Sequence, residues 1–132
     1  MRVLIIYNQQ VLSDTHAEAD SEQEILGTVD AVREILNQEG FEVTCLAVGR
    51  NLGLLASEIF RRRPDVVFNL FEGLADEPST ESRVAEILER LDVPFTGCNS
   101  WTLRMARSKH ETKRIMLEAG LPTAHGVCLL LT

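Results

Sequence analysis

Acidic side chains gather in one stretch of the chain, directly after a short apolar run. Glu72, Asp76 and Glu77 lie within residues 70–79, and Glu81 follows them. Carboxylates in such a loop could face a cationic group, such as a substrate ammonium or a metal ion. The same residues also describe a solvated acidic loop, whose charges suit the positive N-terminal end of the next helix. From the residues alone, the second interpretation is favoured.

Basic side chains form two candidates for anion binding. Lys109 and Lys113 lie four residues apart, so they share one face of a predicted helix. Lys109 falls in the first turn, where a cation opposes the helix dipole and where an anionic ligand such as phosphate would offset that cost. Arg61–Arg63 could also bind an anion, but a basic run in the last turn of a helix complements the negative end of that helix. For both groups a structural role without a ligand is the favoured interpretation.

Two glutamates occupy the start of the first predicted helix. Glu22 and Glu24 lie next to the end of the first predicted strand. Acidic residues in a first turn stabilise the helix. They are also well placed for a ligand at the carboxyl edge of a sheet.

The histidines and cysteines are scattered, and none has a partner at the spacing of a metal site or of a C-x-x-C motif. Cys98 follows the fourth predicted strand, but no paired base can be named for it, so we expect a partly buried thiol rather than a nucleophile. Unpaired thiols fit a reducing compartment, which predicts the cytoplasm. The residues concerned are His16, His110, His125, Cys45, Cys98 and Cys128.

Length and composition limit the possible classes of protein. A chain of 132 residues with 45% apolar residues fits one globular domain. The net charge of −7 argues against nonspecific binding to nucleic acid, which relies on Lys and Arg. No apolar run reaches the length of a membrane span. The apolar run at the N-terminus is too short for a signal peptide and is predicted to be a strand.

Predicted strands and helices alternate, which indicates an α/β fold with an open, mostly parallel sheet and helices on both faces. The strands are predicted at residues 2–7, 41–48, 65–69 and 94–96, with a strand-like tail at 124–131. The helices are predicted at residues 20–39, 51–63, 80–91, 99–107 and 108–119, with caps at Asp20 or Ser21, Asn51, Ser79 or Thr80, and Asn99 or Ser100. Ligands of such sheets lie beyond the carboxyl ends of the strands. That edge would bring together loops 8–20, 70–79 and 97–100.

Two blocks of residues carry a resemblance to a known family. The first block is Asp65–Gly73, which contains the pairs Phe68-Asn69 and Glu72-Gly73. The second begins with Val93–Gly97 and continues with Ser108-Lys109, Thr112-Lys113 and the Ala-Gly-Leu-Pro run at 119–122. In this order and at these distances, the blocks resemble the N-terminal domain of D-alanine–D-alanine ligases, in the ATP-grasp superfamily.

The resemblance implies a Rossmann-like pre-ATP-grasp domain over residues 1–122, with residues 123–132 leading toward an ATP-grasp domain. It implies a cytoplasmic ligase that uses ATP and Mg²⁺ to join two amino acids such as D-alanine for peptidoglycan. By the resemblance, Lys109 would touch the ATP phosphates and Glu24 would anchor the ammonium of the first D-alanine. Glu72 would lie near the second substrate, and a homodimer is compatible with the family.

The chain also departs from the family pattern. Asn8-Gln9-Gln10 stands in place of a Gly-Ser loop, and Ala75–Pro78 in place of a Gly-Glu-Asp-Gly loop. Glu72 stands where family members often carry a histidine, which inverts the charge near the carboxylate of the second substrate and leaves the amino-acid pair open. The family's ATP-clamping lysines and metal-binding acids lie beyond residue 132. We therefore expect no turnover, no catalytic or metal-binding residues and no tightly bound cofactor in residues 1–132 alone.

Two other interpretations stay open. One is a stand-alone noncatalytic binding or dimerisation module derived from the same family. The other is a small phosphoacceptor receiver, but Asn8 and Asn69 stand where a receiver needs acidic residues. The apolar run at 127–131 favours a chain that continues, because alone it must pair on the sheet, bury in a dimer or expose apolar surface. We predict that removal of residues 124–132 barely lowers stability.

Overall fold

The computed structural model describes residues 1–9 and 19–127, and strands and helices alternate as predicted up to residue 90, after which two more helices follow. The three strands are β1 (Arg2–Asn8), β2 (Glu42–Val48) and β3 (Val66–Leu70). The five helices are α1 (Ala19–Gln38), α2 (Leu52–Arg62), α3 (Thr80–Arg90), α4 (Ser100–Ala106) and α5 (Lys109–Glu118). Most of the predicted loop 8–20 lies outside the described residues.

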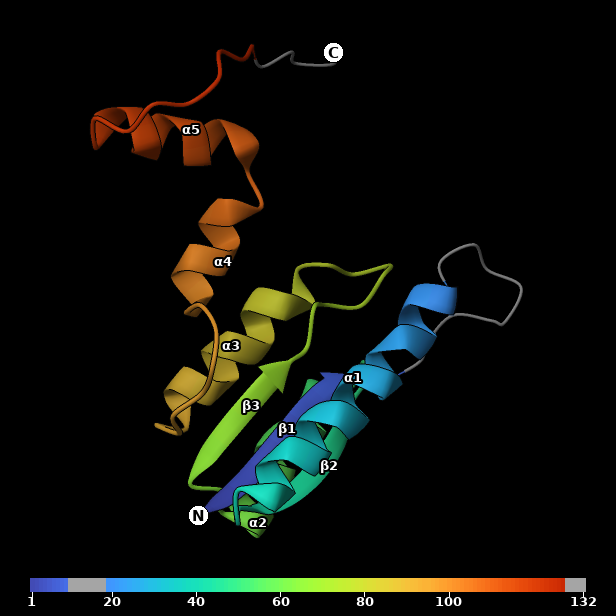
Figure 1. The fold of residues 1–132 in the computed structure, drawn as a ribbon. Helices are drawn as coiled ribbons and strands as arrows, with labels where there is room; N and C mark the ends of the chain where they lie inside the picture. The colour runs from blue at the N-terminus through green and yellow to red at the C-terminus, as the bar shows by residue number, and fades with distance from the viewer. Residues whose placement is uncertain (10–18, 128–132) are drawn as a thin grey trace.

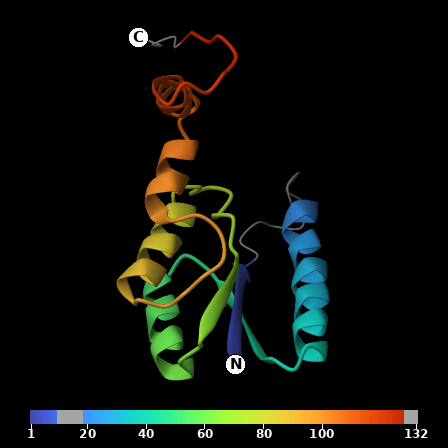
Figure 2. The same cartoon turned by 60° about the vertical axis from the view of Figure 1, so that its left-hand side comes forward.

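The strands form one open, parallel sheet in the order β2-β1-β3 (Figure 1). Ile5 of β1 lies opposite Cys45 of β2 and Phe68 of β3. Helix α1 covers one face of this sheet, whereas α2 and α3 cover the other (Figure 2). The predicted α/β class with helices on both faces is therefore confirmed. Because the strands are parallel, their carboxyl ends meet at one edge, which we call the carboxyl edge.

The fourth predicted strand is reduced to a single bridge between Val67 and Phe95. The Val67 N–H donates to the Pro94 carbonyl at 2.8 Å, and the Thr96 N–H donates to the Val67 carbonyl at 3.1 Å. Pro94 has no N–H to extend this pairing. Positive φ angles at Asp92 (52°) and Gly97 (101°) turn the chain away on both sides, which limits the extended stretch to a few residues.

The core lies mainly between the sheet and the pair α2 and α3. Alternate residues of a strand face opposite sides, so Leu4 and Ile6 point to this core, whereas Val3 and Ile5 belong to the face that α1 covers. Val29 of α1 is buried on that face. The main cluster consists of Leu4, Ile6, Val48, Leu52, Leu55, Ile59, Val67, Phe71, Leu74, Val84 and Leu88.

A side chain caps the start of three of the described helices, and two of these caps, Asn51 and Asn99, are the predicted ones. Asn51 accepts from the Gly53 N–H at 3.2 Å, and Asn99 accepts from the Thr102 N–H at 2.8 Å. Ser108 accepts from the Glu111 N–H at 3.3 Å. Helix α1 begins at Ala19, before either predicted cap. Ser79 precedes α3 but makes no side-chain capping bond.

The last two helices extend away from the sheet. Helix α4 packs against α3, and α5 continues beyond α4 (Figures 1 and 2). After α5, residues 121–127 form neither helix nor strand, so the predicted strand at 124–131 is wrong for its first four residues, and the remainder lies outside the described residues. In the described ranges no helix is long and apolar enough to cross a membrane.

Candidate functional site

The loop between β3 and α3 is fastened to the end of β1 at the carboxyl edge. The side chain of Asn8 accepts a hydrogen bond from the Glu72 N–H at 2.9 Å and donates one to the Gly73 carbonyl. One side chain thus satisfies a donor and an acceptor of consecutive loop residues. The backbone at Glu72 is held in a fixed position relative to the sheet.

The same loop is tied internally and to the segment after the bridge. Asn69 accepts from the Phe71 N–H at 3.1 Å, and the Asn69 N–H donates to the Thr96 hydroxyl at 2.9 Å. The buried Thr80 hydroxyl accepts from the Leu74 N–H at 2.8 Å and donates to the Glu77 carbonyl at 2.6 Å. The Thr80 hydroxyl therefore makes its hydrogen bonds within the loop. Helix α3 begins without a capping hydrogen bond from the Ser79 side chain.

Gly73 is required by this arrangement. Its φ angle is +90°, which side chains rarely adopt. A Cβ at this position would lie 2.9 Å from the Pro78 carbonyl oxygen and 3.3 Å from the Glu81 Cβ. The loop therefore closes onto its own backbone at residue 73, next to the exposed Glu72.

Two of the four candidate carboxylates in and after the loop 70–79 form ion pairs with arginines. Asp76 pairs with Arg50, which follows β2, at 2.5 Å. Glu77 pairs with Arg83 of α3 at 2.8 Å. These carboxylates fix the loop to β2 and α3, which supports the structural interpretation of Asp76 and Glu77 rather than a ligand-binding one.

Glu72 and Glu81 differ from that pair. Glu72 is exposed and, among the described residues, forms no ion pair. Glu81 is partly buried, and this burial raises the pKa of its carboxyl, an effect that Arg107 opposes and Glu72 reinforces. Glu72, Glu81 and Arg107 therefore share one electrostatic environment beside the carboxyl edge. Arg107 follows α4 and was not a sequence-based candidate, because the carboxyl on which its charge acts belongs to α3 rather than to its own helix.

Glu24 and Lys109 lie outside this cluster. Glu24 is exposed in the N-terminal part of α1, and α1 begins at the end of the molecule toward which β1 and β3 point (Figure 1). Lys109 begins α5, beyond α4 and away from the sheet. Neither is joined to Glu72 by a hydrogen bond or an ion pair recorded within the described residues. The predicted candidates thus occupy separate parts of the domain.

Lys109 lines a groove of about 650 Å³ between α5 and the segment 123–127. Lys113 lines the same groove, which confirms that the two lysines share a helix face. His110 and His125 are exposed at this groove, as predicted for solvated histidines. The described residues hold no group of three His, Cys, Asp or Glu side chains that could bind a metal ion.

The arginines at 61–63 contact side chains of their own helix, α2. Arg61 and Arg62 pair with Glu58 at 2.6 Å and 2.7 Å. Arg63 lies just past the last turn, with φ +47°, and its guanidinium lies 5.9 Å from the centre of the Phe60 ring. The structural interpretation of this run therefore agrees with the contacts.

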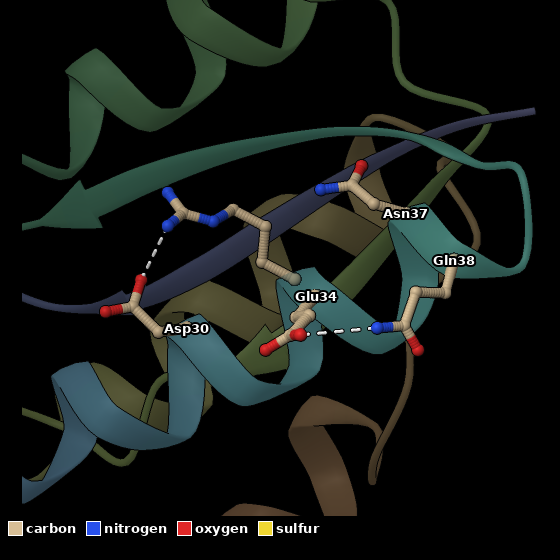
Figure 3. Close-up of a pocket in the computed structure, with 5 residues that line it drawn as sticks. Asp30, Glu34, Asn37 and Gln38 are labelled. Carbon is tan, nitrogen blue, oxygen red and sulfur yellow. Dashed lines mark hydrogen bonds and ion pairs between the residues drawn. The ribbon is translucent and has the colours of Figure 1, made fainter.

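Two further features carry no site. Cys98 is exposed, which corrects the predicted partly buried thiol, because the turn at Gly97 places it on the surface before α4. A hollow beside α1 is lined by polar side chains of that helix (Figure 3). There Arg33 pairs with Asp30 at 2.9 Å, and Gln38 donates to Glu34 at 3.2 Å.

Comparison with known proteins relates the chain to one group of enzymes. It is 33% identical over 104 residues to a D-alanine–D-alanine ligase of Rhizobium meliloti, and the aligned residues cover 79% of this chain and 32% of that protein. It is 33% identical over 99 residues to D-alanine–D-alanine ligase B of Mesorhizobium japonicum, covering 75% of the chain and 30% of that protein. A ligase of Rhodopseudomonas palustris is 29% identical over 110 residues, or 83% of the chain and 34% of that protein.

The chain is therefore homologous to D-alanine–D-alanine ligases over most of its length and is related to their N-terminal region. It spans about a third of the length of the curated relatives it matches. No family model matches the chain, and no solved structure matches it.

Proposed function

We propose that this chain is the N-terminal, substrate-side domain of a D-alanine–D-alanine ligase-like enzyme, which uses ATP to form a peptide bond between two amino acids. The observation that carries the proposal is the 33% identity over 104 residues to the Rhizobium meliloti ligase. This relationship supports the proposed reaction class, the proposed D-alanine substrate and the proposed cytoplasmic setting. A homodimer stays a prediction of the same kind.

The carboxyl edge is the proposed substrate side of the domain. Asn8 holds the backbone N–H of Glu72 and the backbone carbonyl of Gly73, so the Glu72 carboxylate projects from a fixed loop. A positioned carboxylate suits the ammonium of an amino acid, because charge-assisted hydrogen bonds are stronger than neutral ones. Glu24, at the start of α1, is the proposed second ammonium contact.

Lys109 is the proposed contact to the phosphates of ATP. Its ammonium is exposed in the groove beside α5, where His110, Lys113 and His125 add to the basic lining. ATP would supply the phosphoryl group that activates a substrate carboxylate. The described residues offer no cluster that fits Mg²⁺, so we assign the metal no ligand in this part of the enzyme.

A chimera tests the proposal. Residues 1–122 would replace the matching region of the Rhizobium meliloti ligase, and phosphate release that depends on D-alanine would be measured. We expect Glu72→Gln to raise the KM for the amino acid about tenfold or more, equivalent to roughly 1.4 kcal/mol. Lys109→Met should raise the KM for ATP instead.

Glu34→Gln is the matched control, because Glu34 is an exposed glutamate of α1. It should leave both KM values unchanged. A chimera that folds but gives no phosphate release would reject the ligase assignment and favour the stand-alone binding or dimerisation module.

A further inference from the structure

The two lysines of α5 have different surroundings although they share one groove. Lys113 is partly buried, and its ammonium donates a hydrogen bond to the Ala124 carbonyl. Lys109 is exposed and forms no ion pair among the residues that the structure describes. Two residues of the same type, one helical turn apart, therefore do not offer equivalent ligands.

The segment after α5 depends on this contact. The Leu121 N–H donates to the Met116 carbonyl at 2.9 Å, which completes the end of α5. Among the described residues, the hydrogen bond from Lys113 is the only one formed by residues 122–127. The segment also follows the Lys113 side chain closely, because a Cβ built on Gly126 would lie 3.5 Å from the Lys113 Cε and Nζ.

The fixed backbone of α5 supports the base of Lys113. The Thr112 hydroxyl donates to the Met105 carbonyl at 3.0 Å, which joins α5 to α4. The Lys113 side chain reaches from this joined pair of helices to a segment that has no helical or strand pairing of its own. An ammonium bound to a backbone carbonyl restrains such a segment more than a solvated side chain can.

We propose that Lys113 is a positioning residue that fastens the segment 123–127 to α5, and that Lys109 is the ammonium of the pair that meets an anionic ligand. The second half of this inference rests on the proposed function of Lys109. The first half concerns contacts within the chain and holds whether or not the domain binds ATP. In the longer enzyme, Lys113 would set the direction in which the chain leaves α5.

The test is backbone ¹⁵N relaxation of residues 124–127 in the intact 132-residue chain. In the unchanged chain we expect order parameters near the rigid value of roughly 0.85, falling below about 0.6 in Lys113→Met. Lys113→Arg should restore most of the order, because a guanidinium also donates to a carbonyl. Lys109→Met, the matched control one turn away, should leave these order parameters unchanged.

The proposal fails if Lys113→Met leaves the four amides as ordered as before, or if Lys109→Met mobilises them equally. The amides of α5 report whether the helix itself has been lost, and Lys113→Arg separates loss of the donor from loss of fold. The KM for ATP in the chimera is the separate functional readout. If Lys109→Met leaves that KM unchanged while Lys113→Met mobilises the segment, the ATP assignment is wrong and the tether stands.

Discussion

Asn8 and Glu72 are joined across 64 positions of sequence by a hydrogen bond of 2.9 Å, from the Glu72 N–H to the Asn8 side chain. The same Asn8 side chain donates to the Gly73 carbonyl. The end of β1 therefore determines where the loop after β3 begins. Asn8 therefore positions the loop that carries Glu72 on the proposed substrate side. The Asn8 side chain makes both of these hydrogen bonds to the backbone.

Asn8→Ala is expected to destabilise the domain by about 1–3 kcal/mol, because it leaves two backbone groups of the loop without their partner. The free energy of unfolding, measured by urea denaturation, checks this. Asn37→Ala is the matched control, since Asn37 is exposed on α1 and its loss should change stability by less than about 0.5 kcal/mol. Equal effects of the two substitutions would show that the loop does not depend on Asn8.

Gly73→Ala is expected to destabilise the domain more than Gly40→Ala. Both glycines have positive φ angles, +90° and +81°, so both substitutions introduce backbone strain of about 1–3 kcal/mol. Only at Gly73 would the added Cβ meet a backbone carbonyl at 2.9 Å, whereas nothing lies within 4 Å at Gly40. Thermal unfolding of the two variants measures the difference, and equal losses would contradict the close contact with Pro78.

The sequence predicted the regular elements well because their signals are local. The apolar spacing of α1 and the apolar runs of β1 and β3 determine those elements within a few residues of their observed ends. The bridge at Phe95 was overpredicted as a strand, since neither the positive φ of Asp92 nor the missing N–H of Pro94 changes the apolar pattern.

The site was less predictable because its contacts are distant in sequence. The acidic loop was recognised, but the pairing of Asp76 with Arg50 depends on how β2 and β3 are arranged around β1. The role of Asn8 depends on the same sheet order. Arg107 was missed because only the packing of α4 against α3 brings it near Glu81.

Glu81→Gln is expected to stabilise the domain at pH 7. Burial raises the pKa of Glu81 above its ordinary value of 4.5, so the folded state binds more protons than the unfolded state between those two values. Stability is therefore lost as pH rises through this window, and an uncharged glutamine avoids the loss. Urea denaturation at pH 7 and below pH 4.5 should show the gain only at pH 7. A destabilising effect at pH 7 would mean that attraction to Arg107 outweighs burial.

Removal of residues 124–132 is expected to lower the melting temperature by no more than about 4 °C, which corresponds to roughly 1 kcal/mol. Residues 124–127 are exposed and belong to no helix or strand, so their loss removes little buried apolar area. A differential scanning experiment on the shortened and full chains checks this. A much larger drop would show that the end of the chain contributes to the core.

Glu58 is expected to titrate far below an ordinary glutamate. Hydrogen bonds from Arg61 and then Arg62 stabilise its carboxylate and lower its pKa from 4.5 to about 2. The unfolded state binds the proton more readily, so Glu58 contributes stability above pH 4.5 that is lost as pH falls from 4.5 toward 2. Carboxyl ¹³C chemical shifts followed over this range measure the pKa directly. Arg61→Met should move the midpoint upward, and an unchanged midpoint would mean that Arg61 does not hold this carboxylate in solution.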